Sequence, residues 1–368
     1  MPPIPMAERI ARAAPHEAPI LSVRNLKTYF RSQEGLVRAV DGLSFDVHAG
    51  RTLGIVGESG CGKSITARSI LGIVDRPGRI EAGEILLRRD GAAAPVDLAR
   101  LAPGGPELQA IRGKEIALIF QEPMSSFSHY YTVGNQIMEA IRWHGAGDRG
   151  EARARAVELL RMVGVPRPER RIDEYPFQLS GGLRQRVMIA MALACNPRVL
   201  IADEPTTALD VTIQAQILEL IDDLRRTRNL AVLLITHDLG VVAEVADRVA
   251  VMYTGRIVEE SPVAELFARP KHPYTEGLLR SVPKLTAAGV EKEERLSTIE
   301  GTVPKPTNLP PGCHFAPRCP HRMPRCTEGD IPLYQLDGGV EVRCVLFDLS
   351  AAVAADKQMG EMRSDAAQ

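Results

Sequence analysis

The chain has 368 residues, of which 45% are hydrophobic and 25% are charged, proportions typical of a globular domain. Its formal net charge of -1 provides no positive field for nucleic acid, so we expect no nucleic-acid partner. No apolar run reaches the roughly 18–20 residues that cross a bilayer, so any membrane role would work through partner proteins.

The predicted elements begin after residues 1–19, where Pro and charged residues predict a disordered leader. Runs of β-branched and aromatic residues predict strands over 20–30 and 37–47. A short apolar strand over 52–56 leads into a Gly-rich loop, and a helix is predicted over 64–72. Further strands are predicted over 84–87 and 116–120.

The second half of the predicted domain alternates helices and strands. A helical pattern over about 132–163 predicts a helical insertion, for which we take approximate bounds of 125–180. Strand signals return at 199–202, 232–236 and 249–253, each separated by a segment of helix length, and this alternation predicts a largely parallel α/β sheet.

A change of composition after Pro273 predicts a domain boundary. From there the chain is rich in Pro, charged residues and Cys, so we place the boundary near residue 280. This gives a first domain over 20–280, a smaller second one over 281–348 and a disordered tail over 349–368.

A phosphate-binding loop is predicted between the strand at 52–56 and the helix that follows. Its sequence, Gly-Glu-Ser-Gly-Cys-Gly-Lys-Ser, fits the pattern G-x4-G-K-[ST], in which backbone N–H groups and a helix N-terminus surround phosphates. A plain Gly-rich turn is the alternative, but the flanking strand and helix count against it. The predicted nucleotide-binding residues are Gly57, Ser59, Gly60, Cys61, Gly62, Lys63, Ser64 and Ile65.

Two further patterns indicate nucleotide chemistry. A buried strand ends in Asp203 and Glu204, where an Asp can support Mg²⁺ and the adjacent carboxylate can act on an attacking water. Ser180, Gly181 and Gly182 open an apolar helix, and Ser is a good N-cap that leaves N–H groups available to an anion. Alone, the first pattern would fit a strand with a solvated turn and the second an ordinary capped helix.

Taken together and in order, these motifs resemble the ABC ATPase family over roughly residues 20–265. The set comprises the P-loop, Gln121, the Leu-Ser-Gly-Gly segment, Asp203-Glu204, Asp210 and His237. The resemblance implies a P-loop ABC ATPase nucleotide-binding domain with a helical insertion, and ATP and Mg²⁺ bound between two subunits.

The resemblance also implies roles for single residues. Glu204 would be the general base, and His237 would contact the γ-phosphate, as would Lys63. Gln121 would join Ser64 and Asp203 at Mg²⁺ and sense the membrane partner. The segment of Ser180, Gly181 and Gly182 would cap the partner's nucleotide, with Asp210 in the loop that crosses the interface. Phe30, in preference to the adjacent Tyr29, would stack on adenine.

A closer resemblance is to the ATP-binding subunits of oligopeptide and dipeptide importers. It rests on residues 120–126, 201–218 and 272–283, and on the Cys-containing stretch 312–326. Leu183, and Ser-His-Tyr-Tyr at 128–131, depart from the family's usual residues. The implied activity is ATP hydrolysis to ADP and phosphate, coupled to uptake of peptides or a related solute.

The implied partners are a second homologous ATPase in a heterodimer, two transmembrane permease subunits and an extracytoplasmic solute-binding protein. The implied location is the cytoplasmic face of the inner membrane. An oligosaccharide or nickel importer is an alternative. A soluble ABC ATPase without a membrane partner is a more remote one, because neither coiled-coil arms nor a second nucleotide domain is evident.

Four cysteines near the C-terminus predict a metal centre. Cys313, Cys319, Cys326 and Cys344 are separated by five, six and seventeen residues, without the close pairs that zinc knuckles favour. Four thiolates suit a [4Fe–4S] cluster, which the importer resemblance also implies; Zn²⁺, or free or paired cysteines, are the alternatives. Because the cysteines lie outside the ATP motifs, we expect the cluster to hold a small domain together without entering hydrolysis.

Overall fold

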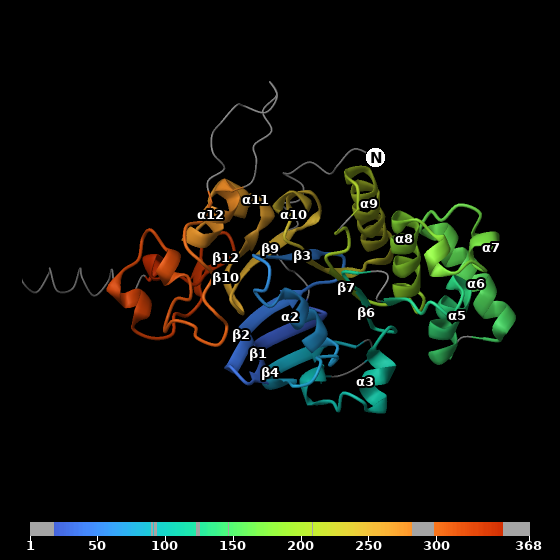
Figure 1. The fold of residues 1–368 in the computed structure, drawn as a ribbon, viewed down its shortest axis with the longest axis horizontal. Coiled ribbons are helices and arrows are strands. Elements are labelled where there is room, and N and C mark those ends of the chain that lie inside the picture. Colours follow the sequence, from blue (N-terminus) through green and yellow to red (C-terminus); the bar gives the residue numbers. More distant parts are fainter. Residues whose placement is uncertain are drawn as a thin grey trace, which may run out of the picture.

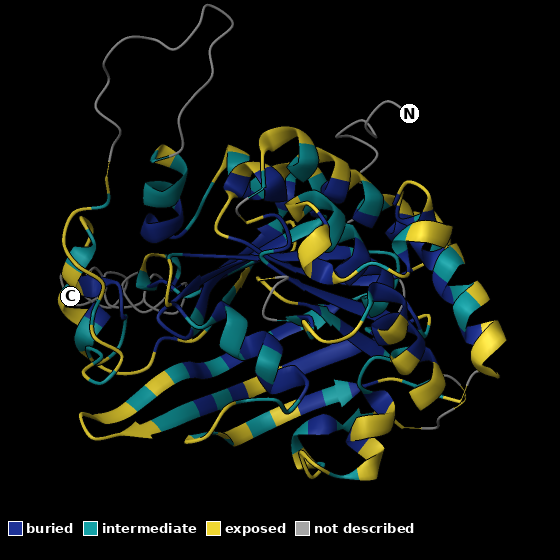
Figure 2. Ribbon diagram, turned by 45° about the vertical axis from the view of Figure 1, so that its right-hand side comes forward, coloured by how far each residue is buried: buried dark blue, intermediate teal, exposed yellow. Residues whose placement is uncertain are grey.

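The structure is a computed structural model, and it describes residues 18–89, 91, 94–122, 126–145, 147–207, 209–281 and 298–348. Nearly all of the predicted leader and the whole predicted tail lie outside the described residues. The described part contains two β-sheets with helices around them, and the strands of the larger sheet run through the centre of the molecule (Figures 1 and 2).

The larger sheet has a parallel centre, as the alternating pattern predicts. In the described part it has eight strands in the order β11-β12-β10-β9-β3-β8-β7-β6, of which β6, β7, β8, β3 and β9 pair in parallel. Strands β3, β7 and β8 are buried at every position, because α2 (Lys63–Ile70) and the smaller antiparallel sheet cover one face of the sheet and helices cover the other. The strands are β3 (Thr52–Val56), β6 (Ile116–Ile119), β7 (Val199–Asp203), β8 (Ala231–Ile235), β9 (Arg248–Tyr253), β10 (Arg256–Pro262), β11 (Tyr334–Leu336) and β12 (Val340–Val342).

The remaining strands form a separate antiparallel sheet, which the sequence does not predict. Its order is β2-β1-β4-β5. β1 and β2 are joined by only two residues, and so short a connection allows antiparallel pairing alone. The strands are β1 (Leu21–Ser32), β2 (Gly35–Val47), β4 (Gly78–Leu87) and β5 (Val96–Asp97).

The predicted helical insertion is present beside β6 and β7, in green in Figure 1. It contains α5 (Val133–Trp143), α6 (Arg149–Met162) and α7 (Pro168–Arg171), and α6 begins with a capping box of Asp148 and Glu151. The other helices are α2 (Lys63–Ile70), α3 (Pro106–Ile111), α8 (Gly181–Ala192), α9 (Val211–Arg228), α10 (Leu239–Val245), α11 (Val263–Ala268) and α12 (Pro273–Arg280). Single 3-10 turns lie at Leu98–Arg100, Pro176–Gln178, Ala316–Arg318, Pro324–Thr327 and Val345–Phe347.

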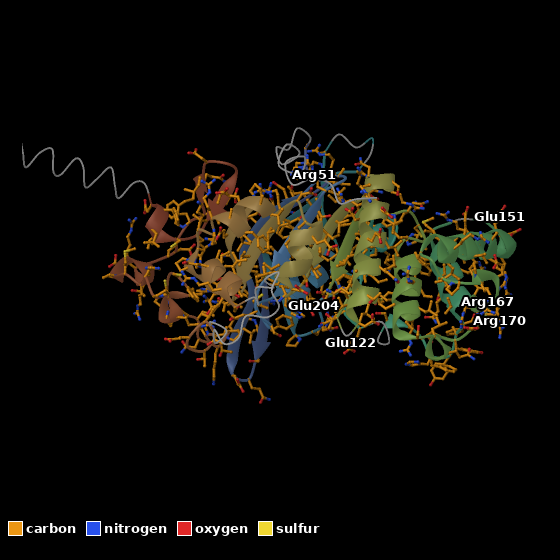
Figure 3. All side chains as sticks on the ribbon, turned by 90° about the horizontal axis from the view of Figure 1, so that it is seen from above. Arg51, Glu122, Glu151, Arg167, Arg170 and Glu204 are labelled. Carbon is orange, nitrogen blue, oxygen red and sulfur yellow. The ribbon has the colours of Figure 1, made fainter. Side chains whose placement is uncertain are left out.

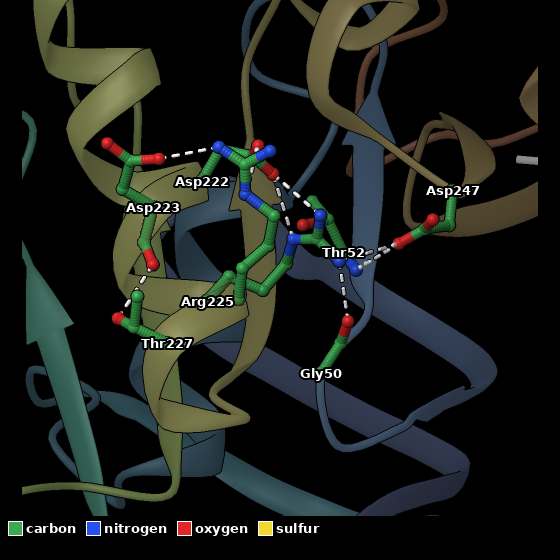
Figure 4. A network of polar contacts seen from close by, with 8 residues as sticks. Gly50, Thr52, Asp222, Asp223, Arg225, Thr227 and Asp247 are labelled. Carbon is green, nitrogen blue, oxygen red and sulfur yellow. Dashed lines mark hydrogen bonds and ion pairs between the residues drawn. The ribbon is translucent and has the colours of Figure 1, made fainter. Parts of the chain in front are cut away.

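A polar network fixes the beginning of β3 against its neighbours (Figure 4). Arg225 of α9 donates to the Gly50 carbonyl at 2.6 Å and to Asp222, while Asp247 accepts from the Thr52 N–H at 2.7 Å. These hydrogen bonds hold the N-terminal end of β3 in place. Because the Gly-rich loop follows the other end of β3, the position where the loop begins is fixed as well.

The C-terminal segment packs directly against the first predicted domain. β12 pairs with β10, so that β11 and β12 extend the larger sheet. Phe315 is fully buried against Tyr253 and Tyr274, with ring centroids 5.4 Å from each. The predicted boundary near residue 280 coincides with the end of α12, and residues 282–297 lie outside the described ranges. The division into two domains stays a prediction.

Candidate active site

The Gly-rich loop joins the end of β3 to the start of α2, as predicted. Gly62 caps α2 in the left-handed region, with φ of 106°. A Cβ atom at Gly62 would lie 2.1 Å from the Ala39 carbonyl oxygen, so only glycine fits. Glycine is therefore required at this position for the loop to lie against β2 where the helix begins.

Lys63 is held inside the loop that is predicted to bind phosphates. Its Nζ donates to the Gly57 carbonyl at 2.8 Å and to the Glu58 carbonyl at 3.1 Å, and the residue is only 5% exposed. The Cys61 sulfur lies 3.8 Å from the same nitrogen. The loop thus surrounds a positive charge, which is what the triphosphate of a nucleotide requires.

Two of the three residues predicted to hold Mg²⁺, Ser64 and Asp203, lie together although they come from distant parts of the chain. The Ser64 hydroxyl donates to Asp203 Oδ1 at 3.0 Å, although 139 positions separate them. Burial raises the pKa of Asp203, while the Ser64 hydrogen bond acts in the opposite direction. A hydroxyl and a carboxylate at a P-loop are the ligands that Mg²⁺ takes in such sites.

Glu204 is the centre of a second group of polar side chains. Its Oε2 accepts from Gln121 Nε2 at 3.0 Å and from the Thr207 hydroxyl at 2.9 Å, and His237 Nδ1 lies 3.3 Å away. Glu204 has a positive φ of 47°, unusual for a residue with a side chain and often found at functional sites. Figure 3 labels Glu204 near the middle of the molecule, remote from Arg167 and Arg170 in the helical insertion.

The predicted site residues Gln121 and His237 lie beside Glu204, and Thr207, which was not predicted, lies there as well. Its hydroxyl holds the carboxylate of Glu204 from the same turn, three positions on. The sequence does contain a signal for this hydroxyl donor, since Thr206 and Thr207 follow directly after the acidic pair and Pro205. A hydroxyl donor at this spacing fixes the direction of the carboxylate.

The Leu-Ser-Gly-Gly segment lies at the start of α8 and is available to a partner. Ser180 is exposed, occupies the N-cap and makes no capping bond with its side chain. A Cβ at Gly182 would lie 2.9 Å from Ile213, whose N–H donates to Asp210 at 2.9 Å. The segment therefore packs beside the predicted interface loop. Within the described ranges, no hydrogen bond or ion pair joins Ser180 or Gly182 to the P-loop.

The chain matches known proteins along most of its length. The family model of the ABC transporter matches residues 40–207, and that of the oligopeptide/dipeptide transporter C-terminal region matches residues 258–326. The oligopeptide transport ATP-binding protein AppD of Bacillus subtilis is 51% identical over 333 residues, covering 90% of this chain and 98% of that protein. The dipeptide transport ATP-binding protein DppD of Bacillus subtilis is 50% identical over 308 residues, covering 83% and 88%.

The chain belongs to the ATP-binding subunits of the oligopeptide and dipeptide ABC transporter family. A solved dimeric bacterial ABC transporter cassette has a TM-score of 0.58 at 28% identity, covering 66% of this chain and 98% of the cassette. The same cassette, solved with ADP and Pi after hydrolysis, gives the same values. This ABC transporter subunit is an ATPase, and its P-loop fold is confirmed.

In this subunit, the two aromatic residues at the end of β1 have different environments. The Tyr29 hydroxyl donates to Asp41 Oδ1 at 2.5 Å, and burial raises the pKa of Tyr29. The Phe30 ring lies over Gly78, where a Cβ would approach it to 2.4 Å, and stays half-buried. Tyr29 is thus already engaged within the subunit, while the contact of Phe30 with adenine stays a prediction.

The four predicted metal ligands of the subunit line one pocket. Cys313, Cys319, Cys326 and Cys344 come together there among largely apolar side chains. Three of the sulfurs accept a backbone N–H from two residues further on, and Cys326 accepts from the Met323 N–H at 3.4 Å. Burial raises the pKa of Cys344 to about 11, and burial also raises the pKa of Cys313 and of Cys319.

The placement of the cysteines does not decide between a cluster and a single ion. Among the residues that the structure describes, no three His, Cys, Asp or Glu side chains gather closely enough to hold a metal ion. The cluster itself stays a prediction.

The cysteine segment is connected to the P-loop, a contact that sequence analysis misses. Arg318, between Cys313 and Cys319, donates to the two carboxylate oxygens of Glu58 at 2.9 and 3.2 Å. The Glu58 N–H donates to the Tyr274 hydroxyl at 3.0 Å. The cysteines are remote from the ATP motifs in sequence but not in space.

We expect Arg318→Gln to weaken ATP binding by this subunit. Loss of hydrogen bonds to a charged partner costs about 1.5–3 kcal/mol, and the Glu58 carboxylate would then no longer hold the loop in place. A nucleotide titration would show a several-fold higher Kd. Arg322→Gln, at an exposed site in the same segment, is the control, and equal affinities in the two variants would contradict the expectation.

Proposed function

We propose that this subunit hydrolyses ATP to drive peptide import through an ABC transporter. The observation that carries the proposal is the 51% identity, over nearly the full length of both chains, to a protein named for oligopeptide transport. Other relatives are also named for peptide or dipeptide transport, among them one of Brucella melitensis that is 49% identical over 337 residues. These names do not favour the oligosaccharide, nickel or soluble alternatives.

The geometry supports a division of roles within the site. Lys63 and the loop N–H groups would bind the phosphates, with Gly57, Ser59, Gly60, Cys61, Gly62 and Ile65 shaping the loop. Ser64, Asp203 and Gln121 would hold Mg²⁺, which neutralises charge on the phosphates. Glu204, held by Gln121 and Thr207, would take the proton of the attacking water, and His237 would contact the γ-phosphate.

Two subunits would form the complete site. Ser180, Gly181, Gly182 and Asp210 of one subunit would face the P-loop of the other, and the similar solved cassette is dimeric. We propose a second homologous ATPase as the partner, giving a heterodimer.

We expect Ser180→Arg to prevent ATP hydrolysis while leaving nucleotide binding unchanged. A bulky charge at an exposed N-cap would block closure against the partner, because Ser180 has no bonded contact with its own P-loop. The measurement is ATP affinity and turnover of the variant beside those of Lys63→Ala. A loss of affinity as large as that of Lys63→Ala would argue against a role across the interface.

The membrane partners would bind near the helical insertion. No described helix is both long and apolar enough to cross a membrane. Tyr130 and Tyr131 are 88% and 57% exposed between Gln121 and α5, so they offer an aromatic contact to a permease subunit. We propose two permease subunits, an extracytoplasmic solute-binding protein, and a peripheral location at the cytoplasmic face of the inner membrane.

We also propose that Cys313, Cys319, Cys326 and Cys344 hold a [4Fe–4S] cluster in a small C-terminal domain. The support is the shared pocket and the N–H donors at its sulfurs. When bound, the cluster would supply a covalent link between segments that have little regular structure of their own. The ATPase domain would span 20–280, with its helical subdomain at about 125–180, and the cysteine domain 281–348.

Affinity purification of the intact complex tests the proposed function. We expect this subunit to bring down two membrane proteins, a related ATPase and a solute-binding protein whose bound ligand is a peptide. Recovery of a binding protein loaded with a sugar or nickel would contradict the peptide assignment. Recovery without any membrane protein would contradict the transport role.

A further inference from the structure

His272 is a buried side chain that neither the nucleotide site nor the cysteine ligands use. It is 1% exposed and precedes α12, where its Nδ1 accepts the Tyr274 N–H at 3.0 Å. Because Nδ1 is an acceptor, the proton of the neutral ring lies on Nε2. In the described part of the chain, this buried Nε2 has no hydrogen-bond partner.

The ring is fixed in place, so it cannot turn to reach a partner elsewhere. The His272 N–H donates to Glu259 at 2.7 Å, and the ring packs against Phe315 with centroids 5.8 Å apart. A buried N–H without an acceptor costs about 1–3 kcal/mol, and folded proteins keep few of them. The helix cap, the backbone hydrogen bond and the ring contact thus leave one donor, Nε2–H, to be satisfied.

The pocket that the four cysteines line contains candidate acceptors for this donor. His272 lines this pocket together with all four cysteines. The other lining residues, apart from His321, are apolar: Pro273, Ala316, Ile331, Val345 and Leu346. The four cysteine sulfurs and His321 are therefore the polar side chains that line this pocket with His272. A cluster with four thiolates is negatively charged, and hydrogen bonds to its sulfurs stabilise that charge and influence its potential.

We propose that His272 donates its Nε2–H to a sulfur of the cluster held by the four cysteines. The inference rests on the proposed [4Fe–4S] cluster and adds a residue from outside the cysteine segment. The backbone N–H donors come from the cysteine segment itself, whereas His272 caps α12, beside the P-loop contact of Tyr274. His272 is thus a positioning residue that ties the cluster to the ATPase part of the subunit.

The first test compares the reduction potential and stability of the cluster in two variants of the full-length subunit. His272→Asn keeps an oxygen that can cap α12 and removes the Nε2 donor. We expect a more negative potential, since the reduced cluster loses a donor, and several-fold faster bleaching of the visible absorbance by a chelator. His321→Asn, at an exposed position in the same pocket, should match the wild type.

A second test uses the wild-type sequence, so that it holds even if the variant misfolds. Histidine labelled with heavy nitrogen only in its ring is incorporated, and pulsed EPR of the reduced cluster should show a hyperfine coupling to a ring nitrogen. An iron cluster with no such coupling, and an unchanged potential in His272→Asn, would overturn the role of His272. Wild-type protein without iron would instead overturn the cluster proposal itself.

Discussion

Replacing Glu204 with Gln is expected to leave ATP binding intact and to lower turnover at this subunit's P-loop by roughly 10²–10⁴-fold. The amide keeps the size of the carboxylate but cannot take a proton from water. The neighbours Gln121 and Thr207, at 3.0 and 2.9 Å, would still hold the side chain in place. Because hydrolysis precedes separation of the subunits, the variant should also accumulate as a closed dimer with ATP.

The measurement is phosphate release, with ATP affinity and oligomeric state followed on the same samples. Glu219→Gln makes the same substitution at an exposed position of α9 and should leave all three unchanged. Lys63→Ala should instead weaken binding, since its ammonium lies inside the loop. Turnover at the wild-type rate in Glu204→Gln would remove this residue from the role of general base.

Replacing Cys344 with Ser is expected to abolish the cluster and the order of the segment that holds it. Purified under nitrogen, the wild type should be brown and carry about four irons per chain, whereas the variant should lose most of its iron. Residues 300–346 should then become sensitive to proteases, because few regular elements support them and the proposed cluster closes the pocket.

The matched control is Cys195→Ser, a half-buried cysteine outside the pocket, which should keep its iron. ATP affinity measured alongside should fall in Cys344→Ser, because Arg318 reaches Glu58 from the same segment. A colourless wild type with one zinc per chain would overturn the cluster assignment and leave the ATPase unaffected.

The nucleotide site was largely predictable because its residues follow strand ends. Asp203 is the last residue of a buried parallel strand, Glu204 follows it, and Lys63 follows the loop after another such strand; the ends of parallel strands meet at one edge of a sheet. Their motifs predict where they lie, and their chemical roles stay predictions. The contact between Ser64 and Asp203, predicted from motif alone, is present at hydrogen-bond distance.

Contacts between distant segments that carry no motif were not predictable from local patterns. Arg318 and Glu58 are 260 positions apart, and neither has a flanking motif that indicates the other. β11 and β12 have only three residues each, too few for a periodic signal. β10 follows β9 through Thr254 and Gly255, both with positive φ, and this hairpin turn was a signal that could have been used.

ATP-driven uptake by reconstituted vesicles tests most directly whether ATP hydrolysis by this subunit drives peptide import. The purified complex is inserted into vesicles with its solute-binding protein and a labelled peptide outside and ATP inside. We expect labelled peptide to accumulate only with hydrolysable ATP. We expect Glu204→Gln in this subunit to stop accumulation while ATP still binds. Peptide accumulation at the wild-type rate in Glu204→Gln would contradict the role of this subunit's ATP hydrolysis. No accumulation in the wild type, with any peptide ligand of the binding protein, would contradict peptide import.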